Sequence, residues 1–439
     1  CDGLTENLIN TLAQLPEVKV ISWTSVQRFK ANLKDPQAVG RKLAVEAVVV
    51  GRVLHRQDRL LVSAELVNVR DQRQLWGGRY DRRFADVMDI EADLAQTIGG
   101  RLRLKLSREQ ANLLARRRAD DPEAYRLYLK GRRIMVGTRQ QMDQAREHFQ
   151  RAIELQPDFA LAYAALAGAY GTEGFYAMRD PADARAKAAF ALKRAQEIAP
   201  NLAEVHSVAA LNRLMDWDWA GAEKESREAI EISPGNSDAH RLRSYYFLAL
   251  GRFDEAAAAC RKAQEFDPLS TRAYHDRAVA LLGKRDYDGA IAEFRRALDL
   301  NPDWTWGFIK MGLAYTHKGM YAEALAAATG ADARFKGSYT PLAASWLGYV
   351  YAASGDKKRA REAMARLQEF AKALPVDPMS FATIHAGWGD KERTLALLEQ
   401  TIAEHWPQAF FLKAWPGLFA EWLESEPRYQ ALLKRMALP

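Results

Sequence analysis

The hydrophobic pattern divides the chain into two parts that have different periods. Between about residues 18 and 84, apolar positions mostly alternate, and Val, Leu and aromatic residues are frequent, as in half-buried strands. From about Asp121 onward, apolar positions recur at helical spacing almost to the end of the chain. The pattern therefore predicts a small α/β domain followed by a long helical region.

Four strands are expected in the first part, over residues 18–23, 47–54, 59–69 and 74–84. Polar breaks of hairpin length separate the last three, so these should form an antiparallel meander. Helices are expected over residues 4–15, over 36–44 and over 84–106. The middle helix has a clear start, because Asp35 suits the N-cap and Pro36 suits the first helical position.

The helical part repeats with a period of 34 residues. Prolines keep this period, and two alanines stand 12 and five residues before them, as at Ala188 and Ala195 before Pro200; the prolines are Pro200, Pro234, Pro268 and Pro302. Small residues are needed where paired helices cross closely. A period of 34 residues with such positions is typical of the tetratricopeptide repeat, or TPR.

The fold class predicted from this pattern is mainly α. We expect a TPR solenoid of about eight helix-turn-helix repeats, preceded by a small α/β domain with a mixed or antiparallel sheet. One repeat, over residues 159–200, carries an extra stretch of about nine residues around 171–180. The expected domains are residues 1–107 for the α/β domain, 108–120 for a linker helix, 121–406 for the repeats and 407–439 for C-terminal capping helices.

Composition excludes several classes of function. The chain has 439 residues and 48% hydrophobic content, but no apolar run long enough to span a membrane. Two cysteines and eight scattered histidines predict neither a disulfide framework nor a metal site. Cys260 falls on an inward helix face and is interpreted as a core residue. No catalytic motif or dinucleotide loop is present, so we expect no enzyme activity and no cofactor.

The charge pattern indicates whether nucleic acid is a partner, and the first residues indicate how the chain was processed. The formal net charge is +7, but basic and acidic residues alternate along most helices, which favours a solvated surface over a nucleic-acid site. The basic run at residues 116–118 is interpreted as a solvated helix end. The chain starts at Cys1 without a signal-like segment, which indicates a processed product or a fragment. A lipid-anchored start is the less favoured alternative, because a helix is expected from Leu4 onward.

Several short segments resemble one known domain. DGLTENL at residues 2–8, VKVI at 18–21, DPQAVG at 35–40, GRV at 51–53, AELV at 64–67 and LWG at 75–77 resemble the TolB-amino-terminal-like (FlgO-like) domain. EPRYQALL at 426–433 resembles the end of the TPR arrays that follow it. The resemblance implies the sensor or partner-binding part of a bacterial regulator, on the cytoplasmic or the periplasmic side where the parent protein is tethered to a membrane.

The same resemblance also implies what this sequence lacks. Such domains usually begin one strand earlier, so we expect an unpaired edge at the strand of residues 18–23 or at its neighbour. Relatives commonly carry a kinase, winged-helix or cyclase domain upstream, and none of these motifs occurs here. Two functions stay open: a non-catalytic protein-interaction scaffold or sensor, and the regulatory part of a nucleic-acid-binding transcriptional regulator.

The expected partner site is the groove lined by the first helix of each repeat. Positions 2, 5, 9 and 12 of that helix should point inward, and the candidate residues are Asp238, Arg241, Tyr245, Arg272, His275 and Trp306. Arginine binds carboxylates in a fork and tryptophan buries area, so a protein or peptide partner of acidic character is expected. The alternative is that the aromatic residues pack between adjacent repeats.

Overall fold

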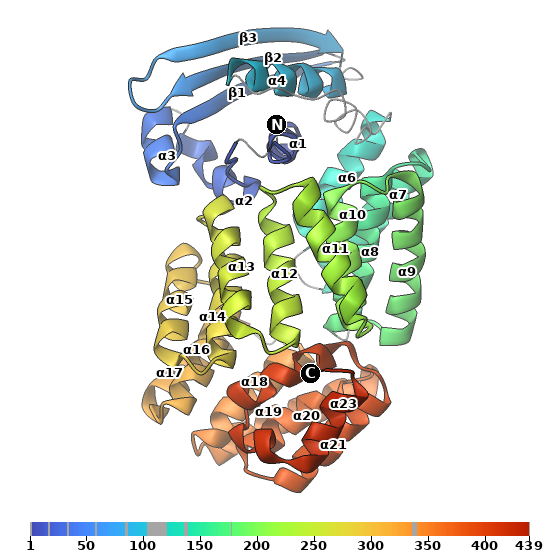
Figure 1. Cartoon of the computed structure of the whole chain (residues 1–439), viewed down its shortest axis with the longest axis vertical. Helices are drawn as coiled ribbons and strands as arrows, with labels where there is room; N and C mark the ends of the chain where they lie inside the picture. Colours follow the sequence, from blue (N-terminus) through green and yellow to red (C-terminus); the bar gives the residue numbers. More distant parts are fainter. Residues whose placement is uncertain are drawn as a thin grey trace.

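The computed structural model describes residues 2–15, 18–32, 35–57, 59–83, 87–102, 121–135, 139–176, 178–335 and 340–438. Figure 1 shows a three-stranded sheet at one end of the molecule and layers of paired helices below it. The predicted fold class is confirmed: the chain is mainly helical, with a TPR solenoid behind a small antiparallel sheet.

The sheet is the predicted meander, in the order β1-β2-β3. Its strands are β1 (Ala47–Arg56), β2 (Arg59–Asn68) and β3 (Gln74–Arg83). The helix before the sheet, α3 (Pro36–Leu43), begins as predicted, because the Asp35 side chain accepts a hydrogen bond of 2.9 Å from the Ala38 N–H. One face of β2 is buried through Leu60, Val62 and Leu66.

Two helices cover that face of the sheet. They are α1 (Asp2–Leu12) and α4 (Val87–Arg101), and Figure 1 shows them between the sheet and the repeats. Leu8 of α1 and Ile90, Leu94 and Ile98 of α4 pack with the inward residues of β2. The small domain therefore has its own apolar core. The expected linker helix over 108–120 and the basic run at 116–118 lie outside the described residues.

The strand predicted over residues 18–23 is wrong. Val18 to Ser22 form no regular structure, and Trp23 begins the short helix α2 (Trp23–Val26), which is followed by η1 (Gln27–Asn32). The Ser22 N–H donates to the Phe266 carbonyl at 2.8 Å, so this segment runs along the repeats instead of joining the sheet. Among the described strands, β1 pairs only with β2 and is an edge.

Eight helix pairs form the solenoid in the described part of the chain. In each pair the first helix is called the A helix and the second the B helix. The pairs are α6 (Pro122–Ile134) with α7 (Arg139–Leu155), α8 (Ala160–Phe175) with α9 (Pro181–Ile198), α10 (Ala203–Met215) with α11 (Trp219–Ile232), α12 (Ser237–Ala249) with α13 (Phe253–Phe266), α14 (Thr271–Gly283) with α15 (Tyr287–Leu300), α16 (Thr305–His317) with α17 (Tyr321–Phe335), α18 (Pro341–Ala353) with α19 (Lys357–Ala373), and α20 (Pro378–Gly387) with α21 (Lys391–Ala403).

Small residues lie where the helices cross, as the 34-residue register predicts. Ala222, Ala256 and Ala290 are fully buried. At Gly131, a Cβ atom would lie 2.5 Å from Cε1 of Phe149, so no larger residue fits unless the ring shifts. Cys260 is also fully buried, and burial raises the pKa of its thiol to about 12, which confirms it as a core residue.

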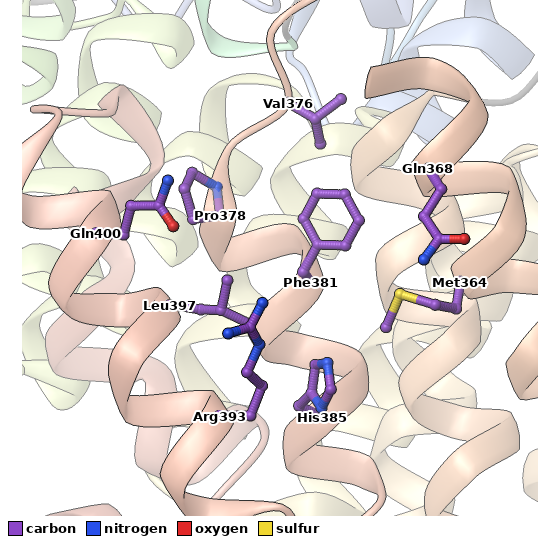
Figure 2. A pocket seen from close by; sticks show the side chains of 9 residues that line it. All are labelled: Met364, Gln368, Val376, Pro378, Phe381, His385, Arg393, Leu397 and Gln400. Carbon is purple, nitrogen blue, oxygen red and sulfur yellow. The ribbon is translucent and has the colours of Figure 1, made fainter. Parts of the chain in front are cut away.

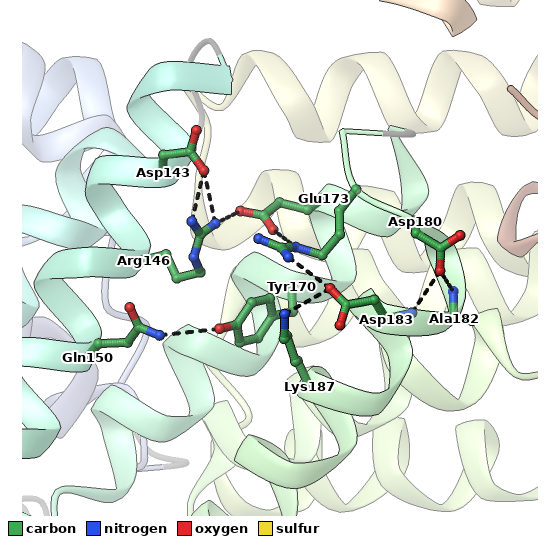
Figure 3. A network of polar contacts seen from close by, with 10 residues as sticks. Asp143, Arg146, Gln150, Tyr170, Glu173, Asp180, Ala182, Asp183 and Lys187 are labelled. Atoms are coloured by element: carbon green, nitrogen blue, oxygen red, sulfur yellow. Dashed lines mark hydrogen bonds and ion pairs between the residues drawn. The ribbon is translucent and has the colours of Figure 1, made fainter. Parts of the chain in front are cut away.

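The extra stretch in the second repeat is held by a network of ion pairs (Figure 3). The Glu173 carboxylate is 3% exposed and accepts from Nη1 of Arg146 and from Nε of Arg179, both at 2.6 Å. Arg179 also pairs with Asp183 at 2.8 Å. This anchoring directs the end of α8, with Phe175 and the following Tyr176, toward the inside of the solenoid, where both contact distant aromatic rings.

The chain after α21 does not continue the stack of repeats. We call residues 406–438 the C-terminal segment, which comprises η3 (Pro407–Ala414), α22 (Trp415–Leu418), η4 (Glu421–Ser425) and α23 (Pro427–Arg435). Its first part, η3, contacts the A helices α8, α10 and α12, and α22 contacts α14. The C-terminal segment therefore crosses the inner wall that the A helices form.

Hydrogen bonds and rings fix this crossing. The Tyr349 hydroxyl donates to the Phe419 carbonyl at 2.9 Å, and Nε2 of His317 lies 2.8 Å from the Leu418 carbonyl oxygen. Phe410 stacks on Phe411 with a centroid distance of 4.1 Å. Because His317 ends α16, the segment contacts the carboxyl-terminal ends of the A helices. The small domain contacts the opposite ends, since Arg28 donates to the Thr271 hydroxyl at the start of α14 at 3.4 Å and the Gly235 N–H before α12 donates to the Ala13 carbonyl at 3.2 Å.

Candidate protein-binding site on the inner wall

Three of the predicted site residues occupy the same position in successive A helices. Asp238, Arg272 and Trp306 are the second residues of α12, α14 and α16, and each is 34 residues from the next. Stacked repeats place equivalent positions side by side. These three residues therefore form a row at the amino-terminal ends of the A helices, away from the C-terminal segment.

Arg241 and Tyr245 form a buried polar cluster with an acid that the sequence analysis did not select. Arg241 lies 3.1 Å from Asp238 through Nε and 3.2 Å from Asp276 through Nη1, and its side chain is 8% exposed. The Tyr245 hydroxyl donates to the same Asp276 oxygen at 2.9 Å. Burial opposes the negative charge of Asp276. A hydrogen bond from His275 and the charge of Arg241 nevertheless hold the pKa of Asp276 well below its usual range.

Two further basic groups lie beside this cluster. Nδ1 of His275 is 3.1 Å from Asp276, whereas its Nε2 is buried and has no partner among the described residues. Lys310, on α16, is 7% exposed, and its Nζ lies 4.0 Å from the centroid of the Trp346 ring. Burial lowers the pKa of Lys310 to about 7. Both groups could donate to an anion that reached them.

Arg272 is exposed, unlike the buried Arg241 and His275. No hydrogen bond or ion pair joins its side chain to another described residue. Its charge nevertheless acts on the wall. Partial desolvation by the surrounding wall opposes ionisation of the Asp238 carboxyl, whose side chain is still exposed, but the charges of Arg241 and Arg272 lower its pKa. Beside it, the Trp306 ring lies 6.4 Å from that of Tyr176, which comes from the anchored end of α8.

The structure thus brings the six predicted residues to one stretch of wall, with three different environments. Arg272 is exposed and Asp238 is 69% exposed at its side chain, whereas Arg241 and His275 are buried. Tyr245 contacts rings of the C-terminal segment, Phe410 at 6.3 Å and Phe411 at 6.5 Å.

Three residues of this wall were not predicted from the sequence, namely Asp276, Lys310 and Tyr176. Asp276 and Lys310 share one position, the sixth of their A helices, which lies outside the 2-5-9-12 pattern. Lys310 could have been found from the sequence, because it places a basic residue at a repeat position that is otherwise buried. No repeat position could have indicated Tyr176, because it lies in the extra stretch.

One group of side chains elsewhere has the composition of a metal site. Nδ1 of His206 lies 2.7 Å from Glu225 and 3.2 Å from Glu228. Nε2 of the same ring lies 2.7 Å from the Pro200 carbonyl oxygen, to which it must donate. Both ring nitrogens therefore already have partners, which favours an imidazolium held by two carboxylates.

Among the described helices, none is long and apolar enough to cross a membrane.

Comparisons with known proteins support the repeat assignment. Two tetratricopeptide-repeat family models match, over residues 218–271 and 271–304. A protein of Rhizobium meliloti (strain 1021), named "Putative adenylate cyclase 3", is 31% identical over 166 residues. That match covers 38% of this chain, and the chain spans about 28% of the length of this curated relative.

Several solved structures are similar, and one of them supports the fold with a TM-score above 0.5. The human IFIT1 dimer with m7Gppp-AAAA matches with a TM-score of 0.51 and 15% identity, covering 80% of each chain. PilF of Pseudomonas aeruginosa matches with a TM-score of 0.36 and 18% identity, covering 47% of this chain and 92% of PilF. The predicted TPR repeats are confirmed by the family models and by the paired helices described above.

Proposed function

We propose that this chain is the non-catalytic interaction module of a bacterial regulatory protein, and that it binds an acidic segment of a partner protein. The proposed site is the stretch of inner wall at the amino-terminal ends of α12, α14 and α16. TPR repeats form protein-interaction scaffolds, which supports the general class. The single observation that carries the site is Arg272, an exposed guanidinium without a protein partner on that wall.

The charges around Arg272 favour an anionic partner group. Arg241 is already paired with Asp238 and Asp276, so its charge is largely used within the wall. Arg272 adds a positive charge that nothing in the described wall pairs with, and Nζ of Lys310 on the same wall has no hydrogen-bond acceptor among the described residues. A carboxylate from a partner would supply the missing acceptor for a charge-assisted hydrogen bond.

The aromatic rings beside Arg272 favour an apolar group next to that carboxylate. Trp306 and Tyr176 are each partly exposed, and their rings lie near one another at the same end of the wall. Aromatic residues in such positions bury a partner's side chain at low entropic cost. We therefore infer a ligand segment in which an acidic residue stands close to a large apolar residue.

The C-terminal segment limits how much of the wall a partner can use. It packs across the carboxyl-terminal halves of the A helices and touches Tyr245, so a peptide cannot lie along their full length. The proposed contact is accordingly short, spanning about three repeats. Affinity should rest on a few contacts near Arg272.

We also propose that the parent protein of this chain is a regulatory protein. This proposal is supported by the resemblance of the amino-terminal part to the TolB-amino-terminal-like domain and by the name of the Rhizobium relative. In such a protein, this chain would sense or recruit a partner while another part performs the output reaction. The sequence of this chain offers no catalytic motif for a cyclase reaction.

The experiment is capture of partners by the full chain, followed by titration of the partner found. Arg272→Glu should abolish capture, and Arg272→Ala should weaken binding by about 1 to 3 kcal/mol with weaker binding as salt rises. Arg261→Glu is the matched control, since Arg261 is exposed on the B helix α13. Equal capture by the Arg272→Glu variant would remove the proposed site, and capture of nucleic acid in place of protein would favour the regulator of transcription.

Arg241 is not a suitable probe of binding. Arg241 was predicted to point into the groove, but its buried guanidinium neutralises the buried carboxylate of Asp276. Arg241→Ala would leave that charge without its partner, and removing one member of a buried pair costs about 3 to 5 kcal/mol. A loss of binding by that variant would therefore report on folding.

A further inference from the structure

The last repeat contains a pocket beside an A helix that is shorter than the one before it. Its A helix, α20, has 10 residues, whereas the A helix before it, α18, has 13. The start of α20 is fixed by the Asp377 N-cap and by Pro378 at its first position. A pocket of about 300 Å³ lies between α19, α20 and α21 (Figure 2).

The pocket has an apolar floor and polar sides. Phe381 of α20 lies at its centre in Figure 2, with Val376 above it and Met364 and Leu397 on opposite sides. Gln368 and Gln400 stand on its two flanks, and Arg393 of α21 points toward the floor. A small set of polar groups over apolar walls is the usual composition of a small-molecule site.

Arg393 has no ion-pair partner among the described residues. The two acidic side chains that α21 offers are occupied elsewhere: Glu392 and Glu399 each lie 2.9 Å from Arg428 of α23. The guanidinium of Arg393 is therefore a positive charge beside an apolar hollow, and no carboxylate in the described part of the chain is bound to it. Such a fork suits a ligand carboxylate.

Asp390 contacts both Arg393 and His385, the two basic residues of the pocket. Asp390 caps α21 by accepting from the backbone N–H of Arg393 at 3.1 Å, and its other oxygen lies 3.1 Å from Nδ1 of His385. The His385 ring also meets Trp388 edge to face at 5.4 Å. These contacts hold the ring at the pocket wall and leave its Nε2 without a partner among the described residues, as a second polar contact for a ligand.

We propose that this pocket binds a small carboxylate with an apolar body, such as an aryl or branched alkyl acid. The carboxylate would pair with Arg393, and the apolar body would lie on Phe381 between Met364 and Leu397. A volume of about 300 Å³ is at the small end of ligand pockets, so the body is limited to about one aromatic ring. The same chemistry is carried by a free acid and by an apolar C-terminal residue of a protein.

This site is independent of the inner wall. It lies between the B helices α19 and α21, whereas the wall near Arg272 is formed by α12, α14 and α16. Failure of one site therefore says nothing about the other.

The test is calorimetric titration of the full chain with phenylpropionate, and with phenylpropionamide and acetate as matched controls. Phenylpropionate should bind with a dissociation constant of about 1 mM or below. The amide lacks the charge and acetate lacks the ring, so each should bind at least tenfold more weakly. Arg393→Gln should remove the preference for the acid, while Arg361→Gln, at an exposed position on α19, should keep it.

A tripeptide that ends in Phe, with a free or an amidated terminus, distinguishes the two sources of the ligand. Tighter binding of the free-terminus peptide than of phenylpropionate identifies a protein C-terminus, and the reverse identifies a metabolite; either result supports the site. Met364→Trp should abolish binding by filling the hollow. Equal binding of acid and amide, or unchanged binding by a folded Arg393→Gln variant, would overturn the proposal.

Discussion

In two repeats, a histidine six residues after the helix-ending proline ties the loop to the next A helix. Nε2 of His206 lies 2.7 Å from the Pro200 carbonyl oxygen, and Nε2 of His240 lies 2.8 Å from that of Pro234. The two histidines differ in their second contact, because His206 also meets Glu225. Burial opposes protonation of both, yet Glu225 raises the pKa of His206, whereas the pKa of His240 is lowered.

We expect these equivalent histidines to titrate in opposite directions from free imidazole. The folded pKa of His206 is raised, so its contribution to stability is present at low pH and is lost as the pH rises through that pKa. For His240 the sign is reversed, and protonation at low pH destabilises the fold. Ring resonances followed by NMR between about pH 5 and pH 8 measure both midpoints. A His206 midpoint at or below that of His240 would contradict the pairing with Glu225.

Asp377 gives a second prediction at this scale. It accepts from the Met379 N–H at 2.8 Å and from the Thr401 hydroxyl at 2.9 Å, but its other oxygen is buried and has no partner among the residues that the structure describes. Burial raises the pKa of this carboxyl to about 7. Between about pH 4 and that value the folded state alone keeps the proton, so the free energy of unfolding should fall as pH rises, by up to about 1.4 kcal/mol per pH unit.

Asp377→Asn keeps the capping oxygen and removes the titration. Denaturant unfolding from pH 4 to pH 8 should therefore show a flatter dependence for Asp377→Asn than for the unchanged chain. Asp356→Asn, at the more exposed N-cap of α19, serves as the control and should keep the original slope. Parallel curves for Asp377→Asn and the unchanged chain would show that Asp377 is ionised in the fold.

Residue identity and repeat position predicted much of the candidate site, but not its state of burial. The 34-residue register correctly aligned Asp238, Arg272 and Trp306 on neighbouring helices. It could not show that Arg241 is buried, because that depends on Asp276, whose position had no assigned role. A side chain's environment is set by contacts across repeats, which a single period does not contain.

At the scale of elements, glycine packing tests the repeat register. A Cβ atom on Gly312 would lie 3.3 Å from the Ala324 carbonyl oxygen and 3.6 Å from Cγ1 of Val350. Gly312→Leu should therefore force α16 away from its neighbours and lower the free energy of unfolding by about 1 to 3 kcal/mol or more. Gly312→Ala is the control, since its single methyl needs only a small shift. Thermal melting of Gly312→Leu at the temperature of the unchanged chain would contradict this packing.

The buried ion pairs of the extra stretch should contribute to the free energy of unfolding. Glu173 is almost fully buried between Arg146 and Arg179 (Figure 3). Glu173→Gln should cost about 1 to 3 kcal/mol, because two guanidinium groups lose a buried carboxylate. Glu154→Gln, which removes an exposed partner of Arg151, is the matched control and should cost about 0 to 1 kcal/mol. Equal unfolding curves for the two variants would show that the network contributes nothing.

The alternating residues before α2 show why one element was predicted wrongly. Val18 and Val20 alternate as in a strand, but a sequence pattern does not show what covers the apolar side. Ile21 is 6% exposed, and the backbone of Ser22 pairs with the repeats. The same periodicity predicted β1, β2 and β3 correctly, because polar breaks of hairpin length joined them to a partner strand.

At the scale of the whole molecule, the C-terminal segment changes the solenoid from an open stack to a closed body. A repeat array normally has contacts only between neighbours, so its stability is roughly a sum of local terms. Here Trp219 of α11 donates to the Met436 carbonyl at 2.6 Å, while Tyr349 of α18 bonds Phe419. Helices more than a hundred residues apart in sequence are thus joined through one segment. The repeat period predicted the array but not this closure, because the segment has no repeat of its own.

This closure predicts cooperative unfolding. Because Phe410 and Trp415 are each 2% exposed and their elements contact A helices of separate repeats, the repeats of α8, α10, α12 and α14 cannot open without exposing the segment. The full chain should therefore unfold in one sharp calorimetric transition, with van't Hoff and calorimetric enthalpies close to each other. Phe410→Ala with Trp415→Ala should lower the melting temperature and split the transition, since each truncation of a buried aromatic costs about 3 to 5 kcal/mol. Phe190→Ala is the control, because that ring is 68% exposed on α9. If the double variant still unfolds in a single transition of unchanged sharpness, the repeats cooperate through their own neighbour contacts and the segment is only a cover.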